Sequence, residues 1–488
     1  MKMKYILSFF LIFSLHTKSS IFDSRAIVHP EVGVNGMVVS QHYLATDAGQ
    51  SILAAGGNAY DASIAVAFAL AVVLPRAGNI GGGGFMVMFD GATDKTYSID
   101  YREIAPELAT KDMFLAVDGT VDKKRATQGI LSIGVPGTVY GMWEVHQKFG
   151  SLPWSQLLAP AIELAEDGFL ISPFMADALN KRYNKLSSYS NFKRIFYADY
   201  PVQMNQLLKQ KNLAKTLKTI SSKGVKGFYE GSVAGNIDSY MKKNGGLITK
   251  KDLKNYRPVW RDTLKGNYHQ YEIVTMAPPS SGGIHVIQML NILEEHNLVA
   301  MGHNSATYAA LLTESMKYAY ADRSEYLGDP GFFDVPVKSL TSKAYAKQVN
   351  KRITLNTITP SNEILPGAAM PPESPDTTHF SVADADGNII SNTYTLNSGF
   401  GSGIVIDGTG VLMNNEMDDF VSAPGVPNQF GLVGGEANKI EPFKRPLSSM
   451  TPTIVLQDGK PVFATGSPGG SRIITAVLQF LLNTLDFK

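Results

Sequence analysis

Hydrophobic positions in the first third of the chain predict two consecutive helices. Between Gln41 and Leu74 the apolar residues recur with a helical period, and Gly56-Gly57 interrupts them as a helix C-cap would. The second stretch, Asp61 to Leu74, is apolar on almost every side but too short to cross a bilayer. We therefore expect it to be a helix buried in the core.

The next pattern is a short apolar run that is typical of a buried strand. A glycine-rich segment, residues 78–84, leads into the run 85–89, and residues 96–100 provide a matching partner strand. From 111 to 350 the pattern is mostly helical, with glycine and proline breaks. The clearest helices of this region are expected at 159–166 and 306–326.

The character of the chain changes near Leu365. Residues 366–376 contain four prolines, which lack an amide donor, so we expect an exposed irregular loop. Residues 379–384 then alternate between apolar and polar, Asp386-Gly387 provides a turn, and 388–394 return as a second strand.

The same hairpin pattern is repeated before the end of the chain. Residues 453–457 and 461–465 flank the turn Asp458-Gly459, and a helix is predicted from Ser471 to about Asp486. Strands combined with long helices favour a layered α/β sandwich over a doubly wound sheet.

Composition excludes some classes of protein and of site but does not indicate a fold. The hydrophobic fraction is 44% and the charged fraction 18%, both typical of globular proteins, and the formal net charge of +1 argues against a nucleic-acid-binding protein. There is no cysteine, which excludes disulfides, thiolate metal sites and cysteine nucleophiles. Lys2 and Lys4 precede an apolar run from Tyr5 to Leu15, so residues 1–20 are interpreted as the signal peptide of an exported protein, either periplasmic or secreted. A buried N-terminal helix is the alternative.

Several common sites are excluded by their motifs. The glycines of 78–84 form neither a P-loop nor a dinucleotide-binding fingerprint, so close backbone packing is the better interpretation. The nine histidines show no metal-ligand spacing, and His379 is expected to be a packing or surface residue. No metal, nucleotide or organic cofactor is implied.

Thr377 is the remaining candidate for chemistry. It follows the proline-rich loop and would begin the next strand. A threonine hydroxyl is a weak nucleophile without a neighbouring base, but an N-terminal threonine carries one in its own α-amine. The hypothesis therefore requires cleavage between Asp376 and Thr377, most simply by attack of the Thr377 hydroxyl on the preceding carbonyl. The alternative is that a Thr-Thr pair at a strand start reflects β-propensity alone.

Five sequence blocks resemble the small subunit of γ-glutamyltransferases, and two more resemble the large subunit. The small-subunit blocks are TTHFSV at 377–382, TYTLN at 393–397, NNEMDDF at 414–420, RPLSSM at 445–450 and TGSPGGSR at 465–472; the large-subunit blocks are 78–84 and YRE at 101–103. The resemblance implies the four-layer αββα sandwich of N-terminal-nucleophile hydrolases (α/β or α+β). It also implies one precursor cut into a large subunit, 21–376, and a small subunit, 377–488.

The resemblance assigns catalytic roles by position. Thr377 would carry the acyl group, and Thr395 would hydrogen-bond and tune its hydroxyl. Gly469 and Gly470 would donate backbone N–H groups to the oxyanion, close to the start of a helix.

The resemblance also assigns binding partners to the two charged groups of the substrate. Arg102 would bind the α-carboxylate of the γ-glutamyl group. The remaining predicted contacts are Ser448 and Ser449 for the carboxylate, and Asn397, Glu416 and Asp419 for the ammonium.

Three features depart from the family pattern. Phe430 stands where many bacterial members carry a tyrosine, in the segment 424–435 that forms a lid, so we expect a more mobile lid. Glu416 replaces a glutamine found in some bacterial members, and its negative charge should favour binding of the substrate ammonium. The chain ends at Lys488, earlier than the family norm, and the sandwich is therefore expected to be truncated at its C-terminal part.

The function implied is removal of the γ-glutamyl group from glutathione and related compounds, with transfer to water, amino acids or dipeptides. A cephalosporin or glutaryl acylase and a polyglutamate capsule transferase are alternatives from the same superfamily. A truncated paralogue that never matures is the alternative without activity. Expected partners are these substrates and acceptors, and the two subunits as a heterodimer; neither nucleic acid nor a membrane anchor is expected.

Overall fold

The computed structural model describes residues 30–355, 357, 359–364 and 377–487, and all elements below belong to the unit formed by residues 35–488. Its larger sheet has six antiparallel strands in the order β1-β9-β10-β2-β3-β6. These strands are Gly36–Val39 (β1), Thr377–Asp384 (β9), Ile389–Thr395 (β10), Gly83–Asp90 (β2), Lys95–Asp100 (β3) and Val259–Arg261 (β6).

The register of this sheet gathers the predicted catalytic segment at one end of three strands. Thr377 on β9 pairs with Thr395 on β10, and Thr395 pairs in turn with Gly83 on β2. The predicted hairpin of 379–384 and 388–394 and the predicted pairing of 85–89 with 96–100 are both confirmed, with every strand end within two residues of its expected position.

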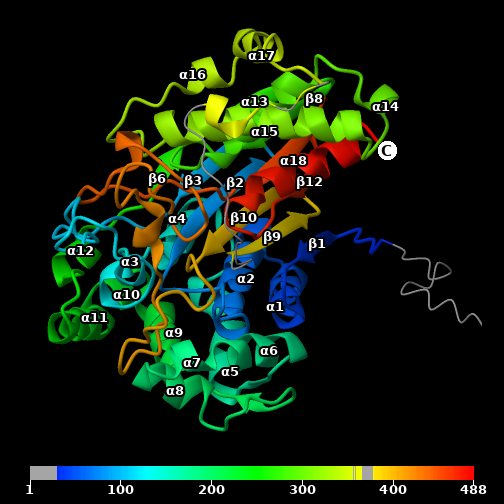
Figure 1. The fold of residues 1–488 in the computed structure, drawn as a ribbon. Coiled ribbons are helices and arrows are strands. Elements are labelled where there is room, and N and C mark those ends of the chain that lie inside the picture. The colour runs from blue at the N-terminus through cyan, green and yellow to red at the C-terminus, as the bar shows by residue number, and fades with distance from the viewer. Residues whose placement is uncertain (1–29, 356, 358, 365–376, 488) are drawn as a thin grey trace, which may run out of the picture. The chain divides into compact units, whose positions relative to one another are not determined.

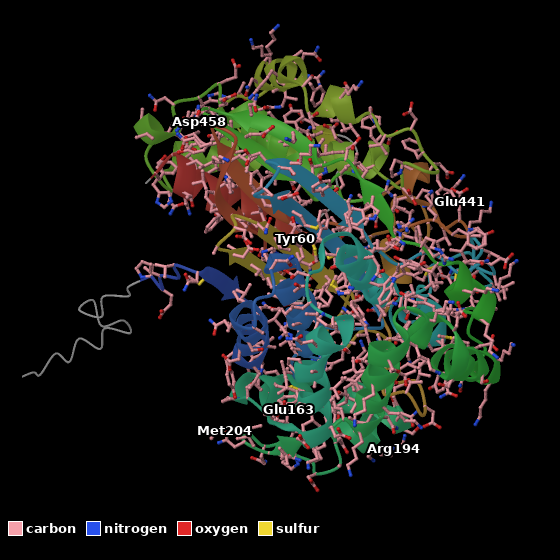
Figure 2. All side chains as sticks on the ribbon, turned by 180° about the vertical axis from the view of Figure 1, so that it is seen from behind. Tyr60, Glu163, Arg194, Met204, Glu441 and Asp458 are labelled. Carbon is pink, nitrogen blue, oxygen red and sulfur yellow. The ribbon has the colours of Figure 1, made fainter. Side chains whose placement is uncertain are left out.

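The second sheet has four antiparallel strands in the order β12-β11-β8-β7. They are Lys460–Thr465 (β12), Thr453–Gln457 (β11), Tyr271–Thr275 (β8) and Leu264–Tyr268 (β7). The β11–β12 hairpin is the predicted one, and Figure 2 labels its turn residue Asp458, which has a φ of 52°.

Strands β6 to β8 correct the expectation of a mostly helical segment from 111 to 350. These strands are three to five residues long, and β7 and β8 join through a tight turn in which His269 has a φ of 51°. Short strands of mixed polarity lack the long alternation that a sequence pattern requires. Distant partners stabilise them in the folded protein: β6 pairs with β3, and β8 pairs with β11, which comes 178 residues later.

Helices cover the outer face of each sheet, so the unit has four layers in the predicted αββα order (Figure 1). Alternate side chains of β2 show the division: Met86 and Met88 join the cluster that contains helix α2, Ala59–Val73. Phe85 and Val87 face the opposite cluster, which contains strands β8 and β11 and three long helices. Those helices are α13 (Gly282–Leu293), α15 (Ala306–Tyr326) and α18 (Arg472–Leu485).

The predicted helices are confirmed within a few residues. Every residue of α2 is buried, and its N-terminus is closed by a capping box between Asn58 and Asp61. Helix α1 (Tyr43–Ala54) ends before Gly56, whose φ is 86°, as the glycine break predicted. The remaining helices are α3 (Lys123–Thr127), α4 (Thr138–Phe149), α5 (Trp154–Asp167), α6 (Pro173–Lys181), α7 (Tyr183–Leu186), α8 (Ser190–Phe196), α9 (Lys211–Lys223), α10 (Lys226–Tyr229), α11 (Gly231–Asn244), α12 (Lys250–Asn255), α14 (Leu298–Met301), α16 (Val337–Leu340) and α17 (Lys343–Asn350).

Short elements complete the description. A two-stranded sheet joins β4 (Phe169–Leu170) to β5 (Leu207–Leu208), and four 3₁₀ turns lie at Ile130–Ser132, Ser361–Glu363, Glu416–Asp419 and Glu436–Asn438. Within the described ranges, no helix is both long and apolar enough to span a bilayer. The predicted signal peptide, 1–20, and the proline-rich loop, 366–376, lie outside the described residues.

The glycine-rich segment serves close backbone packing, as expected. A Cβ on Gly82 would lie 2.1 Å from the Thr395 carbonyl oxygen, and one on Gly81 would lie 2.2 Å from the Leu412 carbonyl oxygen. Asn79 fixes the turn, because its side chain accepts from the Gly82 amide at 2.8 Å and donates to the Thr395 carbonyl at 2.8 Å. The segment thus presses against the end of β10 that carries Thr395.

Candidate active site

One cavity brings together nearly all of the residues that the sequence singled out. Its lining comprises Arg102, Thr377, Thr395, Asn397, Glu416, Asp419, Phe430, Leu432, Ser448, Ser449, Met450, Gly470 and Ile473. Of the other predicted site residues, Gly469 precedes Gly470, and Asp376 lies outside the described residues. Segments that are hundreds of residues apart in sequence therefore meet at a single site.

Thr377 is buried at the first position of β9. Its hydroxyl donates to Thr395 Oγ1 at 3.4 Å, across the antiparallel pair that the two residues form. Thr395 Oγ1 also accepts from the backbone N–H of Asn397 at 2.9 Å. Asn397 has a φ of 77°, a left-handed conformation that asparagine tolerates better than most residues. The turn after β10 therefore fixes the hydroxyl that faces Thr377.

Gly469 and Gly470 form the turn into helix α18. Their φ values, 131° and 57°, lie in the region that favours glycine. The amides of Arg472 and Ile473 donate back to the carbonyls of Gly469 and Gly470, at 3.0 and 3.2 Å. The positive end of a 14-residue helix dipole thus lies beside Gly470 in the cavity wall.

The guanidinium of Arg102 is fully buried and held on several sides. It pairs with Glu416 through Nη1 and with Asp419 through Nη2, and its Nε donates to the Pro446 carbonyl at 3.3 Å. Its backbone N–H donates to Asp100 at 3.0 Å. The predicted carboxylate-binding and ammonium-binding groups thus pair with each other across the cavity wall.

Three buried carboxyl groups share this one guanidinium. Burial raises the pKa of Glu103 to about 8, and Glu103 Oε2 is 3.8 Å from Arg102 Nη1. Burial also raises the pKa values of Glu416 and Asp419, while the positive charge of Arg102 opposes the rise. In the other direction, burial lowers the pKa of Arg102, but the neighbouring carboxylates outweigh it and leave that pKa above its ordinary value. Glu103 therefore keeps its proton near neutral pH, and a cationic ligand group beside Glu416 and Asp419 would favour their ionised forms, as Arg102 does.

The serine pair is anchored by the segment before helix α13. The amide and hydroxyl of Ser281 both donate to the Ser448 carbonyl at 2.8 Å, and the Ser448 amide donates to the Pro279 carbonyl at 2.9 Å. The Ser448 hydroxyl accepts from the Met450 amide at 3.1 Å. Both serines line the cavity with fixed backbones.

The segment 424–435 contributes Phe430 and Leu432 to the cavity lining and is hydrogen-bonded to two acidic residues. Asn428 donates to Asp419 at 3.3 Å, and the Gln429 amide donates to Asp418 at 3.1 Å. Ser398 donates to the Gln429 side chain at 2.7 Å. Between these anchors Phe430 is 95% buried and contributes to the cavity wall.

His379 lies outside the cavity lining, as expected of a packing histidine. Burial lowers its pKa to about 3, and its ring nitrogens lie 2.9 Å from Thr393 Oγ1 and 3.0 Å from Ser381 Oγ. A Cβ on Gly466 would lie 2.2 Å from the ring, so the histidine is tightly enclosed.

The sequence did not single out Arg323, Asp418 or Glu103 individually. Arg323 comes from helix α15 and donates to Ser449 Oγ at 3.5 Å and to Ser281 Oγ at 3.1 Å. Asp418 and Glu103 are each adjacent in sequence to a predicted residue, Asp419 and Arg102. Only the structure shows which contacts belong to each member of these pairs. No local pattern links a helical arginine to a cavity-lining serine 126 residues later.

Comparisons with known proteins agree with these observations. A family model described as gamma-glutamyltranspeptidase matches residues 45–488. The glutathione hydrolase proenzyme of Escherichia coli (strain K12) is 50% identical over 464 residues, which are 94% of this chain and 80% of that protein. The chain therefore spans about four fifths of that relative's length.

Two solved structures share the fold over large parts of the chain. A cephalosporin acylase from Bacillus halodurans has a TM-score of 0.80 at 28% identity and covers 96% of this chain, while this chain covers 84% of it. A γ-glutamyltranspeptidase from Helicobacter pylori has a TM-score of 0.67 at 47% identity, with 70% of this chain and 97% of that chain covered.

Proposed function

This chain belongs to the γ-glutamyltranspeptidase family, and from that premise we propose that it cleaves the γ-glutamyl bond of glutathione and other γ-glutamyl compounds. The γ-glutamyl group would pass first to Thr377 and then to water, an amino acid or a dipeptide. Matching curated relatives from Escherichia coli and Bacillus subtilis are named glutathione hydrolase proenzymes. The name "proenzyme" supports a maturation step here as well.

The observation that carries the proposal is the charge pattern beside Thr377. The free end of a γ-glutamyl group presents one carboxylate and one ammonium, and both require partners when they leave water. Arg102 and the serine pair suit the carboxylate, whereas Glu416 and Asp419 suit the ammonium. A bound substrate would replace the internal ion pairs of Arg102 by pairs with its own two charges.

Maturation would cut the bond between Asp376 and Thr377. The Thr377 hydroxyl would attack the Asp376 carbonyl, and the amide C–N bond would break, which frees the threonine amine and leaves Asp376 as an ester on Thr377. Water would then hydrolyse this ester, which separates the two chains and restores the Thr377 hydroxyl. The products are a large subunit, 21–376, and a small subunit, 377–488. Support comes from the position of Thr377 at a strand start, directly after the predicted loop.

The matured Thr377 would supply both nucleophile and base. Its α-amine takes the hydroxyl proton as Oγ attacks the γ-carbonyl carbon. The tetrahedral intermediate then expels the amine of the leaving peptide, which receives that proton, and an ester on Thr377 remains. Water or the amine of an acceptor attacks this ester and regenerates the hydroxyl.

Gly469, Gly470 and Thr395 would assist this chemistry. Backbone N–H groups at the glycine turn would stabilise the oxyanion, and one such donor typically lowers the activation free energy by about 3 kcal/mol. Thr395 would orient the attacking hydroxyl through the 3.4 Å contact. Export to the periplasm or medium, directed by residues 1–20, is part of the same proposal.

An acylase with a glutaryl substrate is the main alternative, and the fold shared with a cephalosporin acylase supports it. A glutaryl group has no ammonium, so Glu416 and Asp419 would face no positive charge from the substrate. A capsule-type transpeptidase is a second alternative, supported by the similar CapD of Bacillus anthracis, at 34% identity and a TM-score of 0.53.

Matched anilides test the choice of donor. We expect kcat/KM to be higher for γ-glutamyl-4-nitroanilide than for glutaryl-4-nitroanilide. Asp419→Asn should reduce this preference about 10- to 100-fold, the range of one hydrogen bond to a charged group. Asp458→Asn, at an exposed hairpin turn, is the control and should leave the preference unchanged. A preference for the glutaryl donor in the wild-type chain would refute the proposal.

A further inference from the structure

Helix α15 presents two side chains, one turn apart, to two segments that contribute to the cavity lining. Tyr320 and Arg323 are at positions i and i+3 and so lie on the same helical face. Both belong to the segment before residue 376, whereas their cavity-side partners, Ser449 and Ser471, come after Thr377. The helix thus spans the two parts of the chain that the proposed cleavage would separate.

Tyr320 contacts the turn that carries the two glycines. Its hydroxyl donates to the Ser471 carbonyl at 2.5 Å, and Ser471 directly follows Gly470. The ring is itself fixed, because it stacks on the buried His285 with a centroid distance of 6.0 Å and an interplanar angle of 21°. His285 in turn lies 3.1 Å from Gln288 through Nδ1. The hydroxyl therefore holds the turn from a rigid support.

Arg323 contacts the segment that carries the serine pair. Its Nη2 donates to Ser449 Oγ at 3.5 Å and its Nε to Ser281 Oγ at 3.1 Å. Ser281 also donates to the Ser448 carbonyl, so Arg323 reaches both serines of the pair, one directly and one through Ser281. The arginine is buried, and its fork fixes two hydroxyl groups at once.

We propose that Tyr320 and Arg323 are positioning residues: Tyr320 aligns the backbone donors of the Gly469–Gly470 turn, and Arg323 aligns the serine pair that receives the substrate carboxylate. The inference rests on the proposed function. It adds the residues that hold the proposed oxyanion donors and the proposed carboxylate-binding serines in place. Neither residue lines the cavity, so each acts through the loop it holds.

The two residues should have different kinetic effects. The glycine donors act on the charge that develops in the transition state, so misalignment lowers kcat and leaves substrate binding nearly unchanged. The serine pair binds the carboxylate before and during the reaction, so its misalignment raises KM. A purely structural role for either residue would not produce this division.

The test uses Tyr320→Phe, which removes one hydroxyl and keeps the ring. Activity is expressed per cleaved chain, because only cleaved chains carry the proposed nucleophile. We expect kcat for a γ-glutamyl anilide to fall about 10-fold, less than the 100-fold or more for loss of a whole donor, with KM changed less than about twofold. Tyr318→Phe is the matched control on the same helix: Tyr318 packs against another cluster, and its variant should behave as the wild type.

A tetrahedral mimic provides a second readout. The Kd of a boronic acid analogue of the γ-glutamyl group should rise in Tyr320→Phe by the factor by which kcat falls, while the Kd of glutamate stays unchanged. Tyr320→4-aminophenylalanine keeps a donor at the same place and should restore kcat. If the Tyr320→Phe chain is not cut, the kinetics of Tyr320→4-aminophenylalanine and Arg323→Lys test the positioning role instead.

For Arg323→Lys, which keeps the charge and loses the fork, we expect KM to rise about 10-fold with kcat nearly unchanged. If the kcat of Tyr320→Phe equals that of Tyr318→Phe, the positioning role is wrong. It is also wrong if Tyr320→Phe and Arg323→Lys lose thermal stability but keep wild-type kcat and KM. If the wild-type chain is cut but turns over no γ-glutamyl donor, the proposed function itself is wrong.

Discussion

At Phe430 a phenyl ring forms part of the cavity wall, and Asn397 lines the same cavity. A tyrosine there would add a hydroxyl able to bond Asn397 and hold segment 424–435 closed. We predict that Phe430→Tyr lowers the ratio of hydrolysis to transfer, because a closed segment admits less water to the ester. The ratio is measured from glutamate and transfer product formed at one acceptor concentration. Phe332→Tyr, at an exposed ring, is the control, and an unchanged ratio in Phe430→Tyr refutes the idea.

Asp418 ties the same segment through the Gln429 amide, and burial, reinforced by the charge of Asp419, raises its pKa to about 7. A carboxyl with a raised folded-state pKa binds its proton more tightly in the folded protein, so stability is lost as the pH rises from about 4 to 7. Asp418→Asn keeps an acceptor and cannot ionise. We predict nearly equal thermal midpoints for variant and wild type at pH 5, and a variant that is a few degrees more stable at pH 8. A midpoint difference that does not change with pH would contradict this assignment.

The candidate site was predictable from the sequence where one residue carries its own chemical signature. Thr377 follows a proline-rich loop, and Arg102 lies in a block that matches a family motif. Tyr320 and Arg323 carry no such signature, because their partners Ser449 and Ser471 are more than 120 residues away. Their contacts depend on the packing of α15, which a linear pattern does not contain.

Among the elements, the glycine-rich turn before β2 supports the catalytic end of β10. A Cβ on Gly82 would lie 2.1 Å from the Thr395 carbonyl and would push that residue away from Thr377. We predict that Gly82→Ala lowers the thermal midpoint and slows cleavage of the chain, because overpacking of a buried turn has few ways to relax. Gly235→Ala, within α11, meets no atom closer than 3.7 Å and should keep or raise stability by up to about 1 kcal/mol. Equal cleavage rates for the two variants would show that the close packing has no role.

Long helices and hairpins with strong turns were the elements that the pattern predicted well. Helix α15 has the predicted bounds, and both hairpins are formed around Asp-Gly turns. Strands β7 and β8 were missed because five-residue strands gain their stability from a distant partner, here β11. Local propensity is a weak guide in such cases.

At the scale of the whole molecule, residues after Thr377 contribute to both sheets. Strands β9 and β10 lie between β1 and β2, and β11 lies beside β8. The proposed cut would therefore divide the backbone without dividing either hydrophobic cluster, since both contain residues from before and after position 377. The layered fold followed from the strand and helix pattern together with the family resemblance, whereas the interleaving of the strands needed the structure.

The central claim is that Thr377 becomes an N-terminal residue and carries the γ-glutamyl group. The direct test is mass spectrometry and N-terminal sequencing of chains quenched in acid during turnover of a γ-glutamyl donor, with Thr377→Ala as the control. We predict a small fragment that begins at Thr377, part of it heavier by one γ-glutamyl group on that residue, and a Thr377→Ala chain that remains whole. A wild-type chain that stays intact after long incubation, or a cut fragment that never acquires the group, would contradict the account.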